Sequence, residues 1–337
     1  MTRPKVYVTL KIPEKELNIL KSFCDVEIND KETSPSKQEI IKRVENKDGL
    51  LCSLIEKIDK EIISYGSKLK VISSISVGFN HIDVSEATKK GIYVTNTPGI
   101  LTNATADFAW TLIISSARRI AEADKYVRDK KWKIPWGLTM FLGSEIYGRT
   151  LGIIGLGRIG TGVAERSKGF KMRLIYYDVI RASKEKEENL GIEYVPLETL
   201  LKESDFISIH VPLTPETQNL ISHNEFKMMK PTAHLINTSR GPIVDEDALI
   251  SALRNRTIAG AGLDVFEKEP IDPDNPLIEL ANVTIAPHIA SATRESRHGM
   301  ANMATENLLN VFKGVNPPQL VNPDVMKIRQ LSETKMV

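Results

Sequence analysis

The sequence predicts an α/β protein built from two doubly wound parallel sheets. Short apolar runs alternate with amphipathic helical patterns over the first hundred residues, and a second alternation of this kind begins at Thr150. Strands that alternate with helices favour parallel sheets with helices on both faces. A final helical pattern runs from about Arg294 to Lys313, after the second sheet. Because the first sheet needs helices on both faces, we expect the chain to cross back and finish on the first domain.

Each element is predicted from its pattern of apolar residues. In the first part of the chain we expect helices at 13–23, 36–45 and 59–68, and strands at 5–10, 49–54, 70–76 and 91–96. The turn cluster at 95–100 ends this part, and a long helix from about Thr102 to Arg128 follows it. In the second part we expect helices at 158–170 and 245–255, and strands at 150–155, 173–178, 206–211, 234–239, 257–265 and 283–288.

The composition indicates a soluble protein of two domains. A chain of 337 residues is long for one core, and its 45 basic and 43 acidic residues leave a net charge of only +2. We therefore expect binding neither to nucleic acid nor to a membrane. Cys24 and Cys52 lie in apolar surroundings and are expected to be free, buried thiols. The N-terminus does not resemble a signal peptide, so a cytoplasmic location is expected.

The stretch "GLGRIG", Gly155 to Gly160, fits the dinucleotide-binding pattern G-x-G-x-x-G. This pattern alone is weak, but here an apolar strand precedes it and an amphipathic helix follows it. Gly155 would allow the tight turn, Gly157 would let the backbone approach a pyrophosphate, and Gly160 would let the helix pack against the strand. A glycine-rich turn without a ligand is the alternative. The context favours a dinucleotide.

The acid at the end of the second strand of this unit, Asp178, favours NAD over NADP. It lies at about the distance from Gly160 at which a carboxylate accepts hydrogen bonds from the adenosine ribose, and it would repel a 2′-phosphate. Arg181 follows closely, and its guanidinium could accommodate such a phosphate. NADP therefore stays possible.

Three further residues follow successive predicted strands: Arg240 in "NTSRG", Glu269 in "LDVFEKEP" and His288 in "APHIAS". Ligands of doubly wound sheets bind beyond the carboxyl ends of the strands, so all three are expected at one edge. Arginine offers a planar fork for a carboxylate, and a carboxylate partner orients a histidine and favours its protonated form. Together with a nicotinamide, these groups suit the reduction of a 2-keto acid. Taken singly, each could be structural, as could the remaining histidines, His81, His210, His223, His234 and His298; no metal-ligand spacing is present.

The chain resembles the D-isomer-specific 2-hydroxyacid dehydrogenase family, most closely its glyoxylate/hydroxypyruvate reductase members. The resemblance covers nearly all of residues 4–323 and rests on "SVGFNHID", "GIIGLGRIG", "HVPLTPET", "NTSRG", "GAGLDVFEKEP" and "PHIASAT" in family order. It implies a Rossmann NAD-binding domain at 100–292, inserted in a flavodoxin-like substrate domain made of 1–99 and 293–325. The polar tail at 326–337 is expected to be loosely ordered or to make oligomer contacts.

The resemblance also implies roles for individual residues. Arg240 would bind the substrate carboxylate and polarise the carbonyl, His288 would be the acid/base, and Glu269 would orient His288, whereas Glu267 is a solvated loop residue. The backbone of the loop Ser76 to Asn80, centred on Val77 and Gly78, would grip the substrate carboxylate, and Leu54 would line the same pocket. The cofactor would contact Arg240, His288 and the following residues: Thr105, Gly155, Leu156, Gly157, Arg158, Ile159, Gly160, Asp178, His210, Val211, Pro212, Thr217, Thr238, Ser239 and Asp264.

The resemblance implies NADH-dependent reduction of a small 2-keto acid: glyoxylate to glycolate, and hydroxypyruvate to D-glycerate. The loop "SSISVGFNHID", Ser73 to Asp83, has no lysine ahead of Gly78, unlike the phosphite-oxidising members of the family. D-3-phosphoglycerate dehydrogenase, another D-2-hydroxyacid dehydrogenase, or an NAD-sensing co-repressor on the same fold are the alternatives. A homodimer is also implied, with Trp136, Met140 and Phe141 at its interface or, alternatively, in the core.

Overall fold

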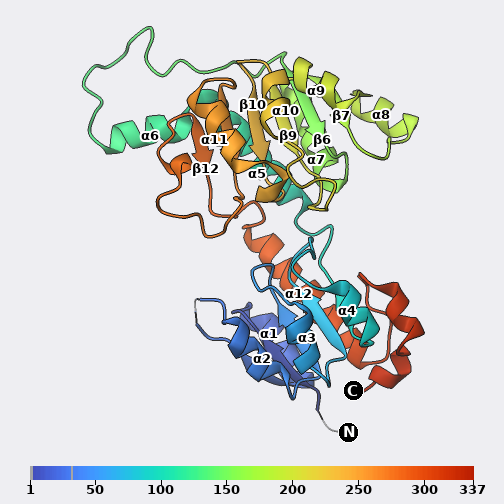
Figure 1. The fold of residues 1–337 in the computed structure, drawn as a ribbon. Coiled ribbons are helices and arrows are strands. Elements are labelled where there is room, and N and C mark those ends of the chain that lie inside the picture. The colour runs from blue at the N-terminus through green and yellow to red at the C-terminus, as the bar shows by residue number, and fades with distance from the viewer. Residues whose placement is uncertain (1–2, 32) are drawn as a thin grey trace. The chain divides into compact units, whose positions relative to one another are not determined.

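The computed structural model describes residues 3–31 and 33–337, and it divides into two compact units. The first unit consists of Met1–Leu101 and Thr293–Val337, and the second of Thr102–Ala292. Each unit contains one parallel sheet with helices on both faces (Figure 1). The predicted α/β class with two doubly wound parallel sheets is therefore confirmed.

The sheet of the first unit has five strands in the order β2-β1-β3-β4-β5. Its strands are β1 (Lys5–Val8), β2 (Asp25–Ile28), β3 (Gly49–Cys52), β4 (Val71–Ser74) and β5 (Tyr93–Thr95). This is a common doubly wound order, in which ligands bind near the point between β1 and β3 where the winding reverses. Strand β2 is absent from the sequence prediction, because "DVEI" alternates charged and apolar residues and lies at the sheet edge.

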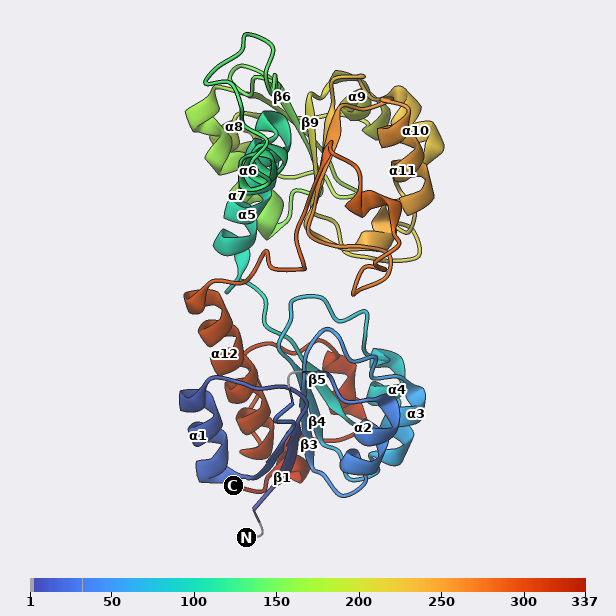
Figure 2. The same ribbon diagram turned by 90° about the vertical axis from the view of Figure 1, so that its left-hand side faces the viewer.

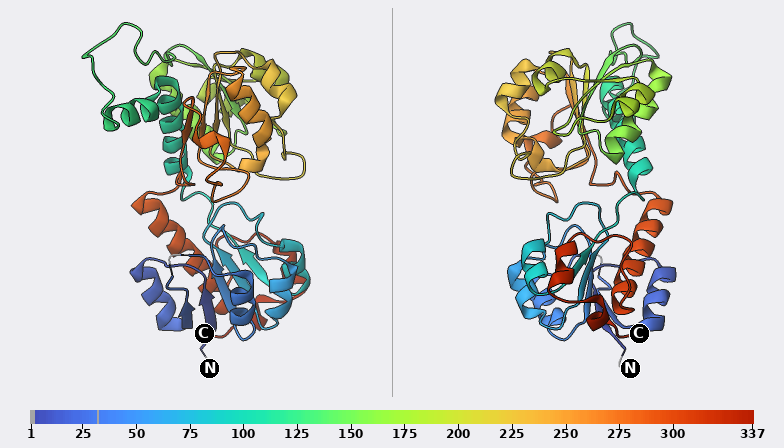
Figure 3. Two further views of the ribbon diagram at one scale, coloured as in Figure 1. Left: turned by 60° about the vertical axis from the view of Figure 1, so that its left-hand side comes forward. Right: turned by 90° about the vertical axis from the view of Figure 1, so that its right-hand side faces the viewer.

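Helices cover both faces of this sheet, as Figure 2 shows. On one face lie α1 (Glu14–Phe23) and α12 (Arg294–Phe312), which pack against each other. On the other face lie α2 (Lys37–Val44), α3 (Lys60–Tyr65) and α4 (Val84–Lys89), and α4 is also missing from the prediction. Helix α12 contacts β3, β4 and β5, so the chain returns to the first unit after the second is complete (Figure 3).

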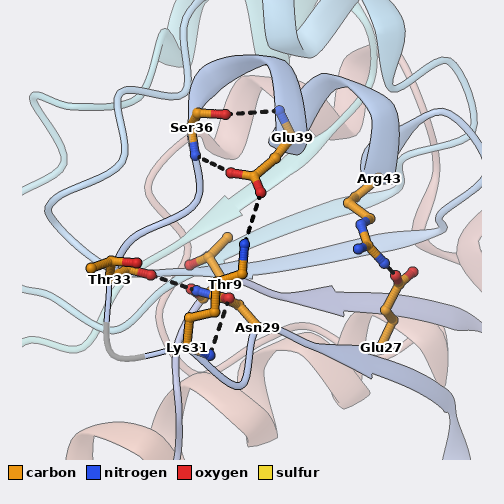
Figure 4. A network of polar contacts seen from close by, with 8 residues as sticks. All are labelled: Thr9, Glu27, Asn29, Lys31, Thr33, Ser36, Glu39 and Arg43. Atoms are coloured by element: carbon orange, nitrogen blue, oxygen red, sulfur yellow. Dashed lines mark hydrogen bonds and ion pairs between the residues drawn. The ribbon is translucent and has the colours of Figure 1, made fainter.

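Side-chain hydrogen bonds fix the turn after β2 and the start of α2, as Figure 4 shows. The Asn29 amide donates to the carbonyl oxygens of Thr9, at 3.0 Å, and Thr33, at 2.9 Å. Ser36 and Glu39 form a capping box, in which each side chain accepts a hydrogen bond from the backbone N–H of the other residue. Lys31, which follows β2, also donates from Nζ to Glu39 Oε1 at 3.2 Å, and this ion pair joins the end of the edge strand to α2.

The C-terminal tail is ordered, so the first of the two alternatives expected for 326–337, loose order, is wrong. It contains two 3-10 helices, η4 (Pro323–Lys327) and η5 (Leu331–Thr334), and belongs to the first unit. Thr334 is fully buried and its hydroxyl donates to the carbonyl oxygen of Val311. The Tyr93 hydroxyl donates to the carbonyl oxygen of Arg329 at 2.7 Å. These hydrogen bonds to buried partners, which a polar sequence does not reveal, hold the tail in place.

The sheet of the second unit has seven parallel strands in the order β12-β11-β10-β9-β6-β7-β8 (Figure 1). Its strands are β6 (Thr150–Ile154), β7 (Arg173–Tyr177), β8 (Ile192–Tyr194), β9 (Phe206–Ile209), β10 (His234–Asn237), β11 (Gly260–Leu263) and β12 (Val283–Ile285). Strand order reverses between β6 and β9, the position at which such folds bind dinucleotides. Only β8, a three-residue edge strand, is missing from the prediction.

Helices on both faces of the second sheet enclose two apolar cores. One face carries α5 (Thr102–Arg118), α7 (Arg158–Arg166) and α8 (Lys184–Leu190), and the other carries α9 (Leu197–Glu203), α10 (His223–Met228) and α11 (Glu246–Arg254) (Figure 2). Leu151 and Ile153 of β6 enter the first core, and Ile154 enters the second. Strands buried on both faces have continuous apolar sequences, which explains why the longer ones are recognisable.

The long helix expected from Thr102 to Arg128 is instead two helices, α5 and α6 (Ile120–Arg128). Arg119 between them has a left-handed backbone, with φ of 54°. Its guanidinium donates twice to Glu122, at 2.8 Å each, and once to the carbonyl oxygen of Leu142. Residues 129–149 then form no helix or strand, and the first part of this segment projects from the body of the unit (Figure 1), whereas Ile146 is buried in its core. In the part of the chain that the structure describes, no helix is long and apolar enough to cross a membrane.

Candidate active site

The glycine turn between β6 and α7 has the geometry that a dinucleotide phosphate needs. Gly155 has φ of +93°, and a Cβ there would lie 2.8 Å from the carbonyl carbon of His210. A Cβ on Gly160 would lie 2.1 Å from the carbonyl oxygen of Gly155, so only glycine lets α7 pack this closely. A Cβ on Gly157 would meet no described atom within 4 Å. Gly157 therefore leaves open space at the start of α7, where backbone N–H groups and the helix dipole attract an anion.

The predicted ribose-binding acid, Asp178, follows β7 and is joined to the glycine turn. Its Oδ2 accepts a hydrogen bond from the Leu156 N–H at 2.8 Å. The carbonyl oxygen of Leu156 accepts a hydrogen bond from Lys186 Nζ at 2.9 Å. Lys186 was not identified from the sequence, because it lies in the strongly charged run "KEKEE", which looks like a solvated helix face. The anion Asp178 and the cation Lys186 thus both form hydrogen bonds with the backbone of Leu156, which lies between the first two glycines.

Arg181, the residue that could accommodate a 2′-phosphate, is held by another partner. It donates to both carboxylate oxygens of Glu187, at 2.9 Å each, and its guanidinium lies over the ring of Tyr194. Hydrogen bonds from Arg181 and then from Tyr176 lower the pKa of Glu187 to about 2. The ion pair is therefore present at every physiological pH and competes with any phosphate for this guanidinium.

The three predicted catalytic residues follow three neighbouring strands of the second sheet: Arg240 after β10, Glu269 after β11 and His288 after β12. His288 Nδ1 lies 2.6 Å from Glu269 Oε2, and Glu269 Oε1 accepts the N–H of Phe266 at 3.0 Å. The His288 and Glu269 side chains are 23% and 31% exposed, so solvent and small molecules reach them within this unit. Arg240 Nη1 donates to the carbonyl oxygen of Ser239 at 2.7 Å.

The charge of Glu269 determines which ring nitrogen of His288 carries a proton. Burial acts to raise the pKa of Glu269, but the hydrogen bond and charge of His288, the Phe266 N–H and the charge of Arg240 hold it below its usual value. Glu269 is thus an anion at neutral pH, and a carboxylate can only accept hydrogen bonds, so Nδ1 of His288 must carry a proton. Nε2 is then the atom through which His288 can exchange a proton with a substrate. Burial lowers the pKa of Arg240, and the Glu269 charge opposes this.

Asp264, placed by resemblance beside the nicotinamide, also holds the backbone that carries His288. It is fully buried, and its two carboxylate oxygens accept the N–H groups of Ile289, at 2.8 Å, and Ala290, at 2.7 Å. Its carbonyl oxygen accepts the His288 N–H at 2.9 Å. His288 itself has the left-handed φ of 54°, which costs energy outside glycine and needs such support. Burial raises the pKa of Asp264, and the two N–H groups oppose that shift.

Of the other predicted cofactor residues of this unit, Arg158 and Ile159 form the start of α7, Thr105 is buried in α5, and the rest follow β9 and β10. His210, Val211 and Pro212 follow β9, where the Thr217 hydroxyl donates to the carbonyl oxygen of Pro212 at 2.6 Å. Thr238 and Ser239 follow β10, and the Ser239 hydroxyl donates to the carbonyl oxygen of Ile209 at 2.9 Å. His210 bonds Ser208 at 2.8 Å, and burial lowers its pKa to about 3, so it stays neutral.

The predicted substrate loop and Leu54 belong to the first unit. Leu54 follows β3, and Val77 and Gly78 follow β4, its neighbour in the sheet. All three are half-buried. The carboxyl ends of two adjacent parallel strands thus place them at one edge of this sheet.

Three other histidines have structural partners that the sequence does not reveal. His234 lies between Ser116, at 2.8 Å, and Ser144, at 3.2 Å, and burial lowers its pKa to about 4. His81 bonds Ser74 at 3.0 Å, and His298 lies 3.7 Å from Glu16. Among the described residues, no group of His, Cys, Asp and Glu side chains could hold a metal ion. Cys24 and Cys52 are buried and free, as predicted.

Comparison with known proteins assigns the chain to a family. Residues 110–290 match the model of the D-isomer specific 2-hydroxyacid dehydrogenase NAD-binding domain. A glyoxylate reductase of Korarchaeum cryptofilum is 53% identical, over 97% of this chain and 98% of that protein. The crystal structure of the TT0316 protein of Thermus thermophilus superimposes with a TM-score of 0.88 at 43% identity, over 94% of this chain and 99% of that one.

A more distant relative has been solved with a cofactor bound. It is an NADPH-dependent glyoxylate/hydroxypyruvate reductase of Sinorhizobium meliloti in complex with NADP and malonate, with a TM-score of 0.81 and 30% identity over 96% of this chain and 98% of that one.

The chain belongs to the D-isomer-specific 2-hydroxyacid dehydrogenase family. It is an NAD(P)-dependent oxidoreductase of the D-2-hydroxyacid dehydrogenase type, similar over its whole length to glyoxylate reductases.

The two glycines at the start of α7 give a matched pair of variants. Gly157→Ala should raise the KM for the reduced cofactor about tenfold, because the methyl group enters the open space at the phosphate position, while the melting temperature stays near that of the wild type. Gly160→Ala should instead lower the melting temperature, by roughly 2–8 °C, because its methyl group overlaps the Gly155 carbonyl oxygen. Steady-state kinetics and thermal unfolding check both. Equal destabilisation by the two substitutions would contradict the roles assigned to them.

Proposed function

We propose that the enzyme reduces glyoxylate to glycolate, and hydroxypyruvate to D-glycerate, with NADH. The observation that carries this proposal is the 2.6 Å contact between His288 and an ionised Glu269. Both residues follow strands that neighbour the strand before Arg240, and the same unit contains an open glycine turn. The similarity to glyoxylate reductases over the full chain supports the choice of substrate.

In this mechanism each residue has one task. Arg240 binds the substrate carboxylate and polarises the keto group, and the backbone N–H groups of Val77 and Gly78 also bind the carboxylate. His288, held by Glu269, donates the Nε2 proton to the keto oxygen as that oxygen becomes negative. The glycine turn at Gly155 to Gly160 would hold NADH, which would supply the hydride for the carbonyl carbon. The product is a 2-hydroxy acid, and the Nε2 proton is then recovered from solvent.

The choice of NADH over NADPH rests on the groups around the glycine turn. The Asp178 carboxylate would repel a 2′-phosphate, and Arg181 is already paired with Glu187. Lys186, 2.9 Å from the Leu156 carbonyl oxygen, is a cation and would attract a 2′-phosphate. The Sinorhizobium meliloti relative is also NADPH-dependent. The repulsion by Asp178 acts on the phosphate itself, so we place NADH first.

The test is the initial rate of cofactor oxidation by purified protein with glyoxylate, hydroxypyruvate and pyruvate, each with NADH and with NADPH. Fast turnover of glyoxylate with NADH is the expected result. A preference for NADPH would overturn the role of Asp178. No turnover with any of the three acids would overturn the proposed substrates and direct attention to phosphoglycerate or to a binding role.

Arg240→Lys should chiefly impair use of the keto acid. An ammonium group is a point charge and cannot replace the two parallel N–H donors that a guanidinium offers a carboxylate. We expect kcat/KM for glyoxylate to fall roughly tenfold or more, since hydrogen bonds to charged groups contribute about 1.5–3 kcal/mol. The dissociation constant of NADH, measured by fluorescence, serves as the control and should change little. Wild-type kinetics in this variant would remove Arg240 from the mechanism.

We also propose that the enzyme is a homodimer whose interface includes the projecting first part of the segment 129–149. Trp136 and Leu138 in this segment are 73% and 77% exposed, and contiguous exposed apolar side chains indicate an interface. Met140 is half-buried, and Phe141 packs on Tyr126 of the same chain, with ring centroids 5.1 Å apart, which leaves Trp136 as the main interface candidate of the three.

The dimer should dissociate when this apolar surface is removed. Trp136→Ser combined with Leu138→Ser is expected to convert a dimer into a monomer in sedimentation velocity, whereas the matched exposed variant Lys133→Ser should remain dimeric. A wild-type protein that sediments as a monomer would contradict the proposal directly.

A further inference from the structure

In the loop that follows β4, three successive peptide carbonyl groups each accept a hydrogen bond from another group of the protein. The carbonyl oxygen of Ser76 accepts the Thr97 N–H at 2.8 Å. The carbonyl oxygen of Val77 accepts a hydrogen bond from Asn96 Nδ2 at 2.8 Å. The carbonyl oxygen of Gly78 accepts one from the Ser76 hydroxyl at 2.6 Å. Each of these carbonyl groups therefore has a fixed direction.

Fixing the carbonyl groups also fixes the N–H groups. In a trans peptide unit the C=O of one residue and the N–H of the next point in opposite directions. The N–H groups of Val77, Gly78 and Phe79 must then point away from the partners that hold the loop. In the described part of the chain, none of these three N–H groups donates a hydrogen bond within the protein. Val77 and Gly78 are half-buried and Phe79 is exposed, so the three donors are available to a ligand.

A relay of hydroxyl groups lies behind the Gly78 carbonyl. Ser74 Oγ lies 2.7 Å from Ser76 Oγ and 3.0 Å from His81 Nε2. Because a carbonyl oxygen can only accept, Ser76 donates its one hydroxyl proton to Gly78 and must accept from Ser74. Ser74 has then used its own proton and accepts from His81, whose Nε2 must carry a hydrogen. The relay thus has one direction, from His81 to the Gly78 carbonyl.

The Val77 carbonyl is held through α12. Asn96, which donates to it, is itself fixed because its backbone carbonyl oxygen accepts the Asn307 side-chain amide at 3.0 Å. Asn307 is fully buried in α12, and its side-chain oxygen accepts the Gln319 N–H at 3.1 Å. Two separate chains of hydrogen bonds, one from His81 and one from α12, therefore hold neighbouring peptide units of the same loop.

We propose that Ser76, with Ser74 and His81 behind it, and Asn96, with Asn307 behind it, are positioning residues for substrate binding. They hold the N–H groups of Val77, Gly78 and Phe79 as a set of three donors for the substrate carboxylate, Phe79 being the third. This rests on the proposed function, in which the loop binds that carboxylate. Networks of this kind are costly to bury unless every group is paired, and here the pairing sets the direction of each amide.

Three variants of the full-length protein separate positioning from stability. Ser76→Ala ends the relay and leaves the Gly78 carbonyl without its donor. Asn96→Asp keeps the size of the side chain but replaces the donor to Val77 with an acceptor, so that this peptide unit is repelled. Ser73→Ala is the matched control: Ser73 is fully buried in β4, donates to the Ala304 carbonyl oxygen at 2.8 Å, and makes no described contact with the loop.

The KM for glyoxylate should rise about tenfold in Ser76→Ala and further in Asn96→Asp, with kcat within about threefold of wild type and NADH affinity unchanged. Ser73→Ala should lower the melting temperature as much as Ser76→Ala does but leave KM unaltered. Wild-type KM in both loop variants, or an equal rise in Ser73→Ala, would overturn the inference.

A binding measurement keeps this inference distinct from the proposed reaction. With the valine, glycine and phenylalanine amides labelled with ¹⁵N, added oxalate should shift the resonances of Val77, Gly78 and Phe79 in the wild type but not in Asn96→Asp. Such shifts without turnover of glyoxylate would support the donor set and overturn the reaction. Turnover without shifts at these amides would do the reverse.

Discussion

His288→Ala should lower kcat for glyoxylate reduction by roughly 10²–10⁴-fold, the usual contribution of a positioned general acid. The reason is that no other group is held so that it can protonate the keto oxygen: Glu269, the nearest partner of His288, is an anion because its pKa lies below the usual value. Hydride transfer would then leave an unprotonated alkoxide. Single-turnover measurements of NADH oxidation report this step directly.

The control for this variant is His223→Ala, since His223 is an exposed histidine of the same unit at the start of α10. It should leave kcat unchanged. NADH binding should be unaltered in both variants. Near-normal turnover in His288→Ala would contradict the assignment of the acid, and loss of NADH binding would show that the substitution disturbs the whole site.

Glu269→Gln should move the pH dependence of the reaction. Because the pKa of Glu269 is lowered in the folded protein, its carboxylate is present throughout the neutral range and is lost only in acid, as the pH falls through that lowered pKa. The wild-type rate of glyoxylate reduction should therefore fall in acid, where the acceptor of the His288 Nδ1 hydrogen bond becomes protonated. In Glu269→Gln, kcat at neutral pH should be roughly tenfold lower, since a hydrogen bond to a charged group is lost. The acid limb should be absent from its pH–rate profile, because no carboxylate remains to be protonated.

Glu267→Gln is the matched control for this change in the pH–rate profile. Glu267 lies two residues away and is exposed, and its carboxylate makes no described contact with His288. Its profile should coincide with that of the wild type. If Glu269→Gln reduced kcat equally at every pH, Glu269 would be acting on the geometry alone and not through its charge.

The strands that the sequence predicts are those with long apolar runs, because both faces of each sheet are covered. Those it misses are the edge strands β2 and β8, whose charged residues alternate with apolar ones or whose length is only three residues. Helices α8 to α10 are short and, in the case of α8, almost wholly polar, so they carry no clear apolar period. The break at Arg119 has no local signal, since "SARRIAEA" is continuous helical sequence and the left-handed residue is held by Glu122 and Leu142.

The candidate site likewise contains residues whose positions the sequence predicts and contacts that it does not predict. The positions of Arg240, Glu269 and His288 can be predicted because each comes directly after a recognisable strand, and neighbouring parallel strands end at one edge. The supporting contacts cannot be predicted. Asp264 holds Ile289 and Ala290, and Lys186 reaches Leu156, through spatial neighbours whose sequence spacing carries no signal. Buried hydrogen bonds of this kind depend on the packing of whole elements.

The return of α12 to the first unit sets an order for biosynthesis. The ribosome makes the five strands of the first sheet early, but Arg294–Phe312 emerges only after the whole of Thr102–Ala292. The second unit therefore has its complete sequence while the first sheet still lacks the helix that covers β3, β4 and β5. Asn307, the α12 residue that fixes Asn96, arrives with that helix. The nascent first unit must keep an apolar sheet face uncovered throughout this interval, which is when chaperones and aggregation compete for it.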